Sequence, residues 1–303
     1  MDFKQSKHTP ILKNMITQVL MDPFFKVSQS NYLLDCTLGG GGHTAALIEC
    51  LPFPHKIIGI DQDKNAIQQA HLRFFKEIQA GRLILIHGRI SELEKLCDEK
   101  PVLGILADLG FSSDQIEDPS RGFSFRLDGP VDMRFDTTRG MSAFELLKII
   151  SEKDLEKILR QYGEERYARR IAARLNLLKK KKQLPSHTQA LAQAISQAVP
   201  SHARYQRIHP ATRSFQALRM KVNQELEELD VLLNRLVPKL QSQGRVAILD
   251  FHSLEDRMIK HYFKSAPFLK ALFKKPIRPS VQELKENPRA RSAKLRVAEK
   301  IET

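Results

Sequence analysis

The sequence has no tryptophan, few cysteines and no long hydrophobic run. Its 303 residues include three Cys, which are Cys36, Cys50 and Cys97. Because three cysteines cannot all pair within one chain, a disulfide-stabilised scaffold is not expected. The first ten residues lack the apolar segment of a secretion signal, and no apolar stretch approaches the ~18 residues that span a membrane. We therefore expect a soluble, cytoplasmic protein without a membrane partner.

The overall composition is that of a globular protein with an excess of positive charge. Apolar residues make up 42% and charged residues 28% of the chain, which argues against wholesale disorder. The length allows about two domains of roughly 150 residues, or one large domain with an insertion. Lys and Arg total 49 against 35 Asp and Glu, a net charge of +14. Such an excess favours a polyanionic partner.

Two segments account for this charge. The segment from Tyr167 to Gln224 contains no Asp or Glu, and the segment from Lys264 to Thr303 carries eleven Lys or Arg against four Glu. The twelve basic residues of the first segment are Arg169, Arg170, Arg174, Lys179 to Lys182, Arg204, Arg207, Arg213, Arg219 and Lys221. A surface that serves only solubility mixes both signs, so we favour a nucleic acid backbone as the partner over a solvated face. A membrane surface is less favoured, because no strongly apolar face accompanies these residues.

The hydrophobic pattern predicts an α/β fold with a helical insertion. Strands are expected at 32–35, 56–60, 83–86, 102–107 and 245–249, with a last short strand near Val297. Helices are expected near 43–51, 64–79, 91–98, 142–161, 164–178 and 188–198, and from about residue 253. Short apolar strands that alternate with helices predict a parallel sheet covered on both faces. We expect residues 1–129 and 211–303 to form a cofactor-binding domain, and 130–210 an inserted, basic, helical substrate-recognition domain.

A glycine loop follows the first predicted strand. Four glycines, Gly39 to Gly42, open the first helix, and Asp61 ends the second strand at a position that suits ribose hydroxyls. The dinucleotide pattern G-x-G-x-x-G fails at Thr44, so the loop favours S-adenosylmethionine (AdoMet) over NAD. A tight turn without a ligand is the alternative. No pair of ligands has zinc-site spacing, so no metal is expected, and His43 either caps the helix or contacts the cofactor.

A series of motifs then occurs in one order along the chain. They are KHTP at 7–10, D-x-T-x-G-x-G-G-H at 35–43, DLGFSS at 108–113, RGFSF at 121–125, DMR at 132–134, YGEER at 162–166, HPATR at 209–213, FQALR at 215–219, VN at 222–223, FHSLEDR at 251–257 and NPRARS at 287–292. Together they closely resemble the bacterial RsmH (MraW) family. Its members use AdoMet to methylate N4 of a cytosine in the decoding centre of small-subunit (16S) ribosomal RNA.

The resemblance covers nearly the whole chain and implies a fold, a site and a partner. The implied fold is a class I AdoMet-dependent methyltransferase (Rossmann-like) sheet with an inserted all-helical domain, and the partner is small-subunit ribosomal RNA or the small ribosomal subunit. The implied cofactor-binding residues are Gly41, Gly42, His43, Asp61, Ile90, Asp108 and Gln115. Ile90 stands where the family usually has Phe, and Asp250 stands where Ser is usual. Both a monomer and a homodimer are compatible with the sequence.

The chemistry of this reaction directs attention to Asp108. The amine of cytosine is a poor nucleophile, so an enzyme must align it and accept its proton. The D/N-P-P-Y loop of many amino-methyltransferases is absent, and Asp108-Leu109-Gly110-Phe111 stands in its place. We expect Asp108 to be catalytic, with help from Ser112 or Ser113; a role in cofactor binding alone is the alternative. A DNA amino-methyltransferase and a nucleic-acid-binding protein with an inactive AdoMet site are the rival functions.

Several residues are candidates for contact with RNA. Phe123 and Phe125, flanked by Arg121 and Arg126, form an aromatic and basic cluster of the kind that stacks unpaired bases. The alternative is that both rings pack their loop onto the sheet. The other candidates are Arg213, Arg219, Lys179 to Lys182, His252 and Arg257.

Overall fold

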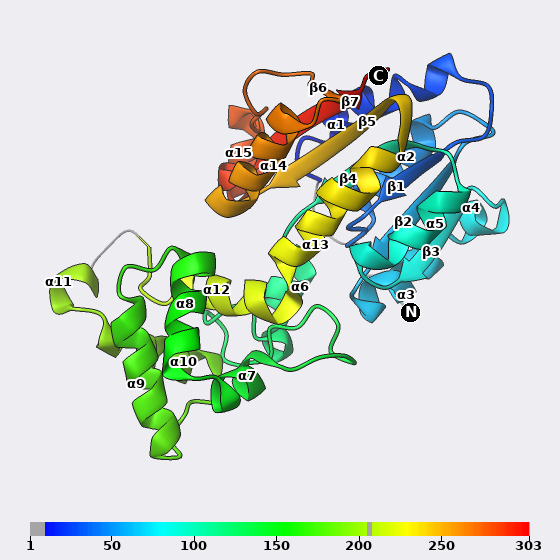
Figure 1. Ribbon diagram of the computed structural model, residues 1–303. Helices are drawn as coiled ribbons and strands as arrows, with labels where there is room; N and C mark the ends of the chain where they lie inside the picture. The colour runs from blue at the N-terminus through cyan, green and yellow to red at the C-terminus, as the bar shows by residue number, and fades with distance from the viewer. Residues whose placement is uncertain (1–9, 205–207, 303) are drawn as a thin grey trace. The chain divides into compact units, whose positions relative to one another are not determined.

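A computed structural model describes residues 10–204 and 208–302 of the chain (Figure 1). The chain folds into two compact units. Unit 1 combines the chain up to Gly110 with the chain from Leu226 onward, and unit 2 is Phe111–Glu225. Of the KHTP motif only Pro10 is described, and Arg207 of the basic segment also lies outside the described residues.

Unit 1 is built on a seven-stranded mixed sheet with the order β3-β2-β1-β4-β5-β7-β6. The strands are β1 (Tyr32–Asp35), β2 (Lys56–Asp61), β3 (Leu83–His87), β4 (Val102–Asp108), β5 (Leu240–Asp250), β6 (Leu269–Ala271) and β7 (Lys294–Lys300). Strands β1 to β5 pair in parallel, whereas β7 runs antiparallel to β5 and to β6. The predicted strands are confirmed, but the sheet is not wholly parallel. The three-residue β6 is too short to show a periodic pattern in the sequence.

Helices cover both faces of the sheet, as the alternating pattern predicts. In β1, Leu33 packs into the core shared with α1, α2 and α3, whereas Leu34 packs into the core shared with α5 and α14. Adjacent residues of a strand point to opposite faces, so a strand buried on both sides is apolar throughout.

The helices of unit 1 are α1 (Lys13–Met21), α2 (Gly42–Cys50), α3 (Lys64–Arg73), α4 (Phe75–Gln79), α5 (Leu93–Glu99), α13 (Glu225–Val231, of which Glu225 belongs to unit 2), α14 (Ser253–Ser265) and α15 (Val281–Glu286). The predicted helix at 64–79 is two helices that meet at Phe74. Helices α1, α13 and α15 were not predicted.

Unit 2 is helical. Its helices are α6 (Ser113–Glu117), α7 (Ala143–Ile149), α8 (Glu152–Gly163), α9 (Ala168–Lys180), α10 (Thr188–Ala198), α11 (Ser201–Arg204) and α12 (Thr212–Asn223). Leu159, Ile171, Leu191 and Leu218 lie in one core without solvent exposure. Serine side chains start two of these helices: Ser142 forms a capping box with Glu145, and Ser151 accepts a hydrogen bond from the Asp154 N–H.

Unit 2 is larger than the predicted insertion of 130–210 at both ends. On the N-terminal side, the loop before residue 130 packs on the helices: the Thr188 N–H donates to the Gly129 carbonyl at 2.8 Å, and Pro130 pairs with His187 in an isolated β-bridge. On the C-terminal side, α12 packs against α8. Loop composition and local periodicity do not reveal such long-range packing, so the boundaries could not be read from the sequence.

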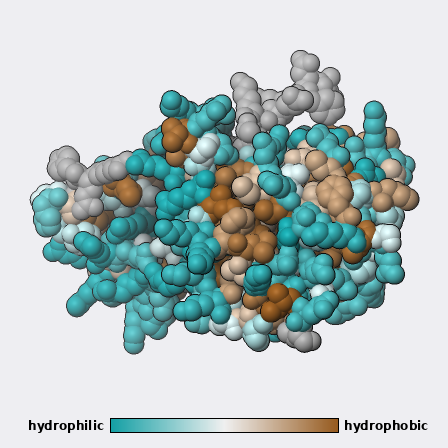
Figure 2. Space-filling view, turned by 90° about the horizontal axis from the view of Figure 1, so that it is seen from above, coloured by the Kyte–Doolittle hydropathy of each residue, from teal (hydrophilic) through white to brown (hydrophobic). Residues whose placement is uncertain are grey.

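The described helices include none that is both long enough and apolar enough to cross a membrane. Figure 2 shows one face of the molecule, on which hydrophilic residues predominate and hydrophobic residues occupy a smaller area.

Candidate cofactor and catalytic site

The carboxyl ends of β1 and β4 form the topological switch point of the sheet. Strands β2 and β3 lie on one side of β1, and β4 and β5 lie on the other, so the chain connections leave in opposite directions. Open α/β sheets bind ligands in the crevice outside such a point. Asp35, Asp61 and Asp108 are the last residues of β1, β2 and β4. Three neighbouring strands therefore end in carboxylates at the expected site.

The glycine loop between β1 and α2 lies at this switch point. Gly39 and Gly41 have φ values of 50° and 69°, in the left-handed region that favours glycine. A Cβ atom at Gly41 would lie 2.6 Å from the ring of Phe74, and one at Gly42 would lie 2.5 Å from the side chain of Pro10. Packing within the chain thus requires both glycines, whether or not they also contact a cofactor.

Asp61 ties the end of β2 to the glycine loop. Its Oδ2 accepts a hydrogen bond from the Gly39 N–H at 2.7 Å, and its Oδ1 accepts one from the Asp63 N–H at 2.8 Å. Burial raises the pKa of Asp61 to about 6, although both hydrogen bonds favour the ionised form. Each carboxylate oxygen has a second lone pair, so Asp61 can still accept hydrogen bonds from ribose hydroxyls.

Asp35 has a structural role beside the loop. It is 1% exposed, and its Oδ2 accepts a hydrogen bond from the Thr44 hydroxyl at 2.6 Å. Burial raises its pKa. The Thr37 hydroxyl in turn accepts from the Asp108 N–H at 2.6 Å, which fixes the end of β4 to the glycine loop.

His43 and Asp108 face one another across this site. His43 is the second residue of α2, and its Nε2 lies 3.5 Å from Asp108 Oδ2, so its side chain points to Asp108 and does not cap the helix. His43 Nε2 and Asp108 Oδ1 are buried, and no described residue forms a hydrogen bond with either atom. Buried polar atoms normally have a partner. The site thus fits a polar, cationic ligand group, and AdoMet carries a sulfonium and an ammonium.

Two further residues expected to bind the cofactor lie in other environments. Ile90 begins a 3-10 turn, Ile90–Glu92, and its side chain is 6% exposed in the core with Leu93 and Cys97. The structure therefore gives this side chain a packing role. Gln115 belongs to unit 2, where its Oε1 accepts a hydrogen bond from the Ser112 N–H at 2.9 Å and completes a capping box at the start of α6.

The end of β5 places a histidine and a carboxylate next to β4. Leu249 of β5 pairs with Asp108 of β4, and His252 follows three residues later. His252 Nε2 lies 3.1 Å from Oε1 of Glu255, whose side chain is 3% exposed. Glu255 was not among the predicted site residues; its position three residues after His252, in the first turn of α14, was the available signal. Arg257 is exposed on the same helix.

Asp250 is a buried carboxylate without a hydrogen-bond partner among the described residues. It is 0% exposed, and no described residue forms a hydrogen bond with either of its oxygens. Burial, together with the negative charges of Asp256 and Glu255, raises its pKa to about 8. Lys294 stands opposite Asp250 in the sheet register, but its Nζ bonds to Asp256 at 2.7 Å.

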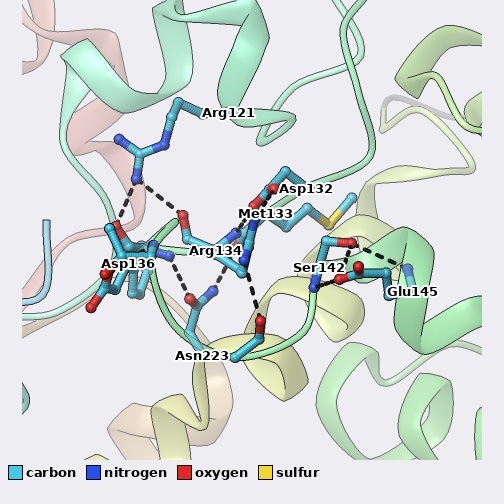
Figure 3. Close-up of polar contacts among 11 residues, drawn as sticks. Arg121, Asp132, Met133, Arg134, Asp136, Ser142, Glu145 and Asn223 are labelled. Atoms are coloured by element: carbon cyan, nitrogen blue, oxygen red, sulfur yellow. Dashed lines mark hydrogen bonds and ion pairs between the residues drawn. The ribbon is translucent and has the colours of Figure 1, made fainter.

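In unit 2, Arg121 belongs to a hydrogen-bonded network that shapes the loop before α7 (Figure 3). Arg121 is 7% exposed, and its Nη2 donates to the carbonyl oxygens of Arg134 and Phe135 at 3.0 and 2.8 Å. The Asn223 side chain accepts from the Phe135 N–H and donates to the Met133 carbonyl, both at 2.7 Å. The motifs at 121–125, 132–134 and 222–223 thus converge on one structural network. The Arg121 guanidinium is committed to this fold and is not placed for a phosphate contact.

The two phenylalanines of the RGFSF motif also pack within unit 2. Phe123 is 9% exposed and stacks with Phe111 and Phe135, at centroid distances of 5.7 and 5.5 Å. Phe125 packs edge-on against Phe215 at 5.0 Å. Both rings therefore pack their loop within unit 2, Phe125 against α12. Phe111, which is 36% exposed, is the accessible ring of the stack.

Arg219 has a carboxylate partner that composition did not reveal. Its guanidinium makes two hydrogen bonds to Glu225, at 2.7 and 2.8 Å, and lies 4.7 Å from the centre of the Phe111 ring. Glu225 directly follows the segment without carboxylates, so counting within that segment excluded it. A bidentate pair with both side chains mostly buried neutralises Arg219 and makes it a poor phosphate contact.

Other cations of unit 2 remain accessible. Arg213 is exposed and makes one long hydrogen bond, 3.4 Å, to the Glu164 carbonyl. Lys180, Lys181 and Lys182 are exposed at the end of α9, whereas Lys179 donates to the Ile150 carbonyl.

Comparison with known proteins shows the family of the chain. Residues 5–301 match the model of the MraW methylase family. The chain belongs to the MraW methylase family. Two proteins named ribosomal RNA small subunit methyltransferase H are similar to it. The one from Persephonella marina is 41% identical, and the alignment covers 97% of this chain and 99% of the relative. The one from Prochlorococcus marinus is 42% identical, and the alignment covers 97% of this chain and 94% of the relative. Among solved structures, a SAM-dependent O-methyltransferase from Thermotoga maritima aligns with 98% of this chain and 68% of its own, at 11% identity and a TM-score of 0.43.

Membership of this family confirms the resemblance drawn from the motifs. It also confirms the methyltransferase fold, the enzymatic activity and AdoMet as the cofactor.

Proposed function

We propose that this protein methylates the exocyclic N4 amine of a cytosine in the decoding centre of small-subunit (16S) ribosomal RNA, acting in the cytoplasm. One observation carries the catalytic assignment. Asp108 ends β4 at the switch point, faces His43, and keeps a buried oxygen that no described residue binds. The names of the two relatives supply the class of substrate.

In this proposal the three carboxylates at the strand ends, Asp35, Asp61 and Asp108, have different roles. Asp61 accepts hydrogen bonds from the ribose hydroxyls of AdoMet, while His43 and Asp108 hold its polar, cationic end. The cofactor supplies an electrophilic methyl group. Asp35 and Thr37 touch neither ligand; they keep the glycine loop and the end of β4 in register.

Asp108 also acts on the target amine. Its carboxylate and the main-chain carbonyls that follow it accept hydrogen bonds from the N4 amine, which aligns the nitrogen lone pair for attack. As the nitrogen–carbon bond forms, the carbon–sulfur bond of the methyl donor would break and its electron pair would stay on sulfur, which would leave as a neutral thioether. The amine would lose a proton in the same step, and the Asp108 carboxylate would take that proton. This role requires an ionised acceptor within hydrogen-bond reach of the amine.

We assign RNA binding in unit 2 to the exposed cations, Arg213 and Lys180 to Lys182. Such side chains position RNA through its phosphates and do not read its bases. We do not assign Arg121 and Arg219 to this role, because their guanidinium groups bind protein atoms.

Methylation of defined substrates tests the function. The protein is incubated with AdoMet and transcribed small-subunit ribosomal RNA, either naked or as assembled subunits, and the product nucleosides are mapped by mass spectrometry. We expect N4-methylcytosine at one position and none in DNA of the same sequence. Methylation of the DNA would favour a DNA amino-methyltransferase. Binding of RNA with no methylation and no calorimetric binding of AdoMet would favour a nucleic-acid-binding protein with an inactive AdoMet site.

A further inference from the structure

Unit 1 contains a second segment without carboxylates. The segment from Arg257 to Gln282 contains no Asp or Glu. Its seven basic residues, here called the C-terminal basic surface, are Arg257, Lys260, Lys264, Lys270, Lys274, Lys275 and Arg278. They lie on α14, on β6 and in the loop that leads to α15. This surface belongs to the same compact unit as the cofactor site, whereas the basic segment at 167–224 belongs to unit 2.

The cations of this surface differ from those of the next strand. All seven are exposed. In β7, by contrast, Lys294 and Arg296 both bind Asp256 at 2.7 Å. Among the described residues, none forms a hydrogen bond or ion pair with Lys270, Lys274, Lys275 or Arg278. Glu299 stands opposite Lys270 in the sheet register, but its carboxylate binds Arg245 at 2.7 Å.

The loop that carries the central lysines is held in place at both ends. The Leu272 N–H donates to the Val297 carbonyl at 3.0 Å, and the Ile277 N–H donates to the Leu295 carbonyl at 2.9 Å. Between these anchors the chain presents Phe273, which is 40% exposed, followed by Lys274 and Lys275. A fixed loop with an accessible ring beside two lysines is typical of surfaces that bind nucleic acid.

Protection of the sheet edge is the competing explanation. Strand β6 is one of the two edge strands of the sheet, and lysines on edge strands discourage pairing with another chain. This explains Lys270, which lies within β6, but Lys274, Lys275 and Arg278 lie beyond the end of the strand at Ala271. Edge protection also does not account for the absence of carboxylates over the whole segment.

We propose that the C-terminal basic surface is a second docking site for the phosphate backbone of the substrate RNA, on the unit that holds the cofactor. The proposal rests on RNA being the substrate. Lysines that neutralise phosphates release counterions, which supplies affinity without reading sequence. A long RNA then contacts both units, and each contact raises the effective concentration of RNA at the other.

A pair of matched variants tests the proposal. Lys270, Lys274 and Lys275 are changed to Gln in one variant; in the control, Lys13, Lys76 and Lys95, three exposed lysines elsewhere in unit 1, are changed to Gln. Filter binding to transcribed small-subunit ribosomal RNA is measured over a salt series. We expect the slope of log K against log salt to flatten by about two units in the first variant, at roughly 0.7 per phosphate contact, and to change little in the control. AdoMet affinity, measured by calorimetry, should match wild type in both.

The outcomes separate this proposal from the proposed function. Equal salt slopes in the two variants would overturn it. A second outcome would also overturn it. In that outcome the wild-type protein binds phosphatidylglycerol vesicles, and the first variant loses this vesicle binding while its RNA binding is unchanged. If the wild type binds RNA with the expected dependence on these lysines but methylates no cytosine, the docking site stands and the proposed function fails.

Discussion

The main-chain N–H of Gly39 donates to Asp61 Oδ2 over 2.7 Å, so the residue expected to bind ribose also holds the glycine loop. The loop and the end of β2 therefore form one element, and a change at Asp61 affects the site even before the cofactor arrives. Replacing Asp61 by Ala should weaken AdoMet binding by ~1–3 kcal/mol, since both the ribose hydroxyls and the loop lose a charged acceptor. Isothermal titration calorimetry measures this loss. An unchanged affinity would contradict the assignment of Asp61.

The dependence of AdoMet binding on pH should report the same carboxylate. Burial raises the pKa of Asp61 to about 6, and only the ionised form offers both oxygens as acceptors. The affinity for AdoMet should therefore rise between pH 5 and pH 7 and level off above pH 7. Asp61→Asn, which cannot ionise, should remove this rise. A rise that persists in the variant would assign the titration to another group.

The ends of the strands show what the sequence could predict. Asp61 follows a short apolar run, and its type and position alone indicated a cofactor site at the carboxyl end of a parallel strand. Asp108 also follows an apolar run, but it was indicated by the family resemblance and by its place where other amino-methyltransferases have their D/N-P-P-Y loop. A strand that is buried on both faces has a continuous run of apolar side chains, so the polar residue that ends the run can be located from the sequence.

Partners distant in the sequence could not be predicted in the same way. Arg121 fits the sequence pattern of an RNA contact, but its guanidinium Nη2 donates to the Phe135 carbonyl at 2.8 Å. Arg219 resembled a free cation because Glu225 lies one residue beyond the counted segment. A basic residue in such a sequence pattern can contact RNA or can form a structural ion pair. Only the fold distinguishes these two roles.

The role of Asp108 can be resolved by kinetics. If Asp108 accepts the proton of the amine, Asp108→Asn should reduce the single-turnover rate at saturating AdoMet more than it reduces AdoMet affinity. The amide keeps nearly the same shape but is a much weaker base than a carboxylate. A variant that reacts at the wild-type rate once AdoMet is saturating would confine Asp108 to cofactor binding. Asp61→Ala is the matched comparison, because its defect should diminish at saturating AdoMet.

Asp250 should make the stability of the protein depend on pH. Its folded pKa of about 8 exceeds the ordinary value of 3.8, so the folded protein binds this proton more tightly than the unfolded chain does. The free energy of unfolding should therefore fall as pH rises toward and through 8. Glu255 and Asp256 oppose ionisation of Asp250, while Lys294 and Arg296 favour it.

Urea unfolding between pH 6.5 and 9 measures the effect of Asp250. This range lies above the pKa of Asp61. Asp250→Asn should flatten the decline and should be more stable than wild type at pH 9 by at least roughly 1–3 kcal/mol, because the amide stays neutral whereas the buried Asp250 carboxylate must ionise without a hydrogen-bond partner. Glu49→Gln, at an exposed carboxylate of the same unit, serves as the control and should keep the wild-type slope. Parallel curves for wild type and Asp250→Asn would show that Asp250 does not titrate in this range.

The lysine run at the end of α9 should bind RNA through three of its four members. Four phosphate contacts would flatten the slope of log K against log salt by nearly three units, at roughly 0.7 per contact. Lys179 donates to the Ile150 carbonyl, however, whereas Lys180, Lys181 and Lys182 are exposed. Changing these three residues to Gln should therefore flatten the slope by about two units. Filter binding over a salt series measures it.

The fourth lysine supplies the internal control. Lys179→Gln should leave the salt slope near that of wild type and should cost up to ~1 kcal/mol of stability, because the hydrogen bond to Ile150 is lost. The triple variant should weaken target and scrambled RNA equally, since phosphate contacts do not read bases, and it should leave AdoMet affinity unchanged. An unaltered slope in the triple variant would mean that the run is only a solvated face. Phosphate binding would then depend on Arg213 and the C-terminal basic surface.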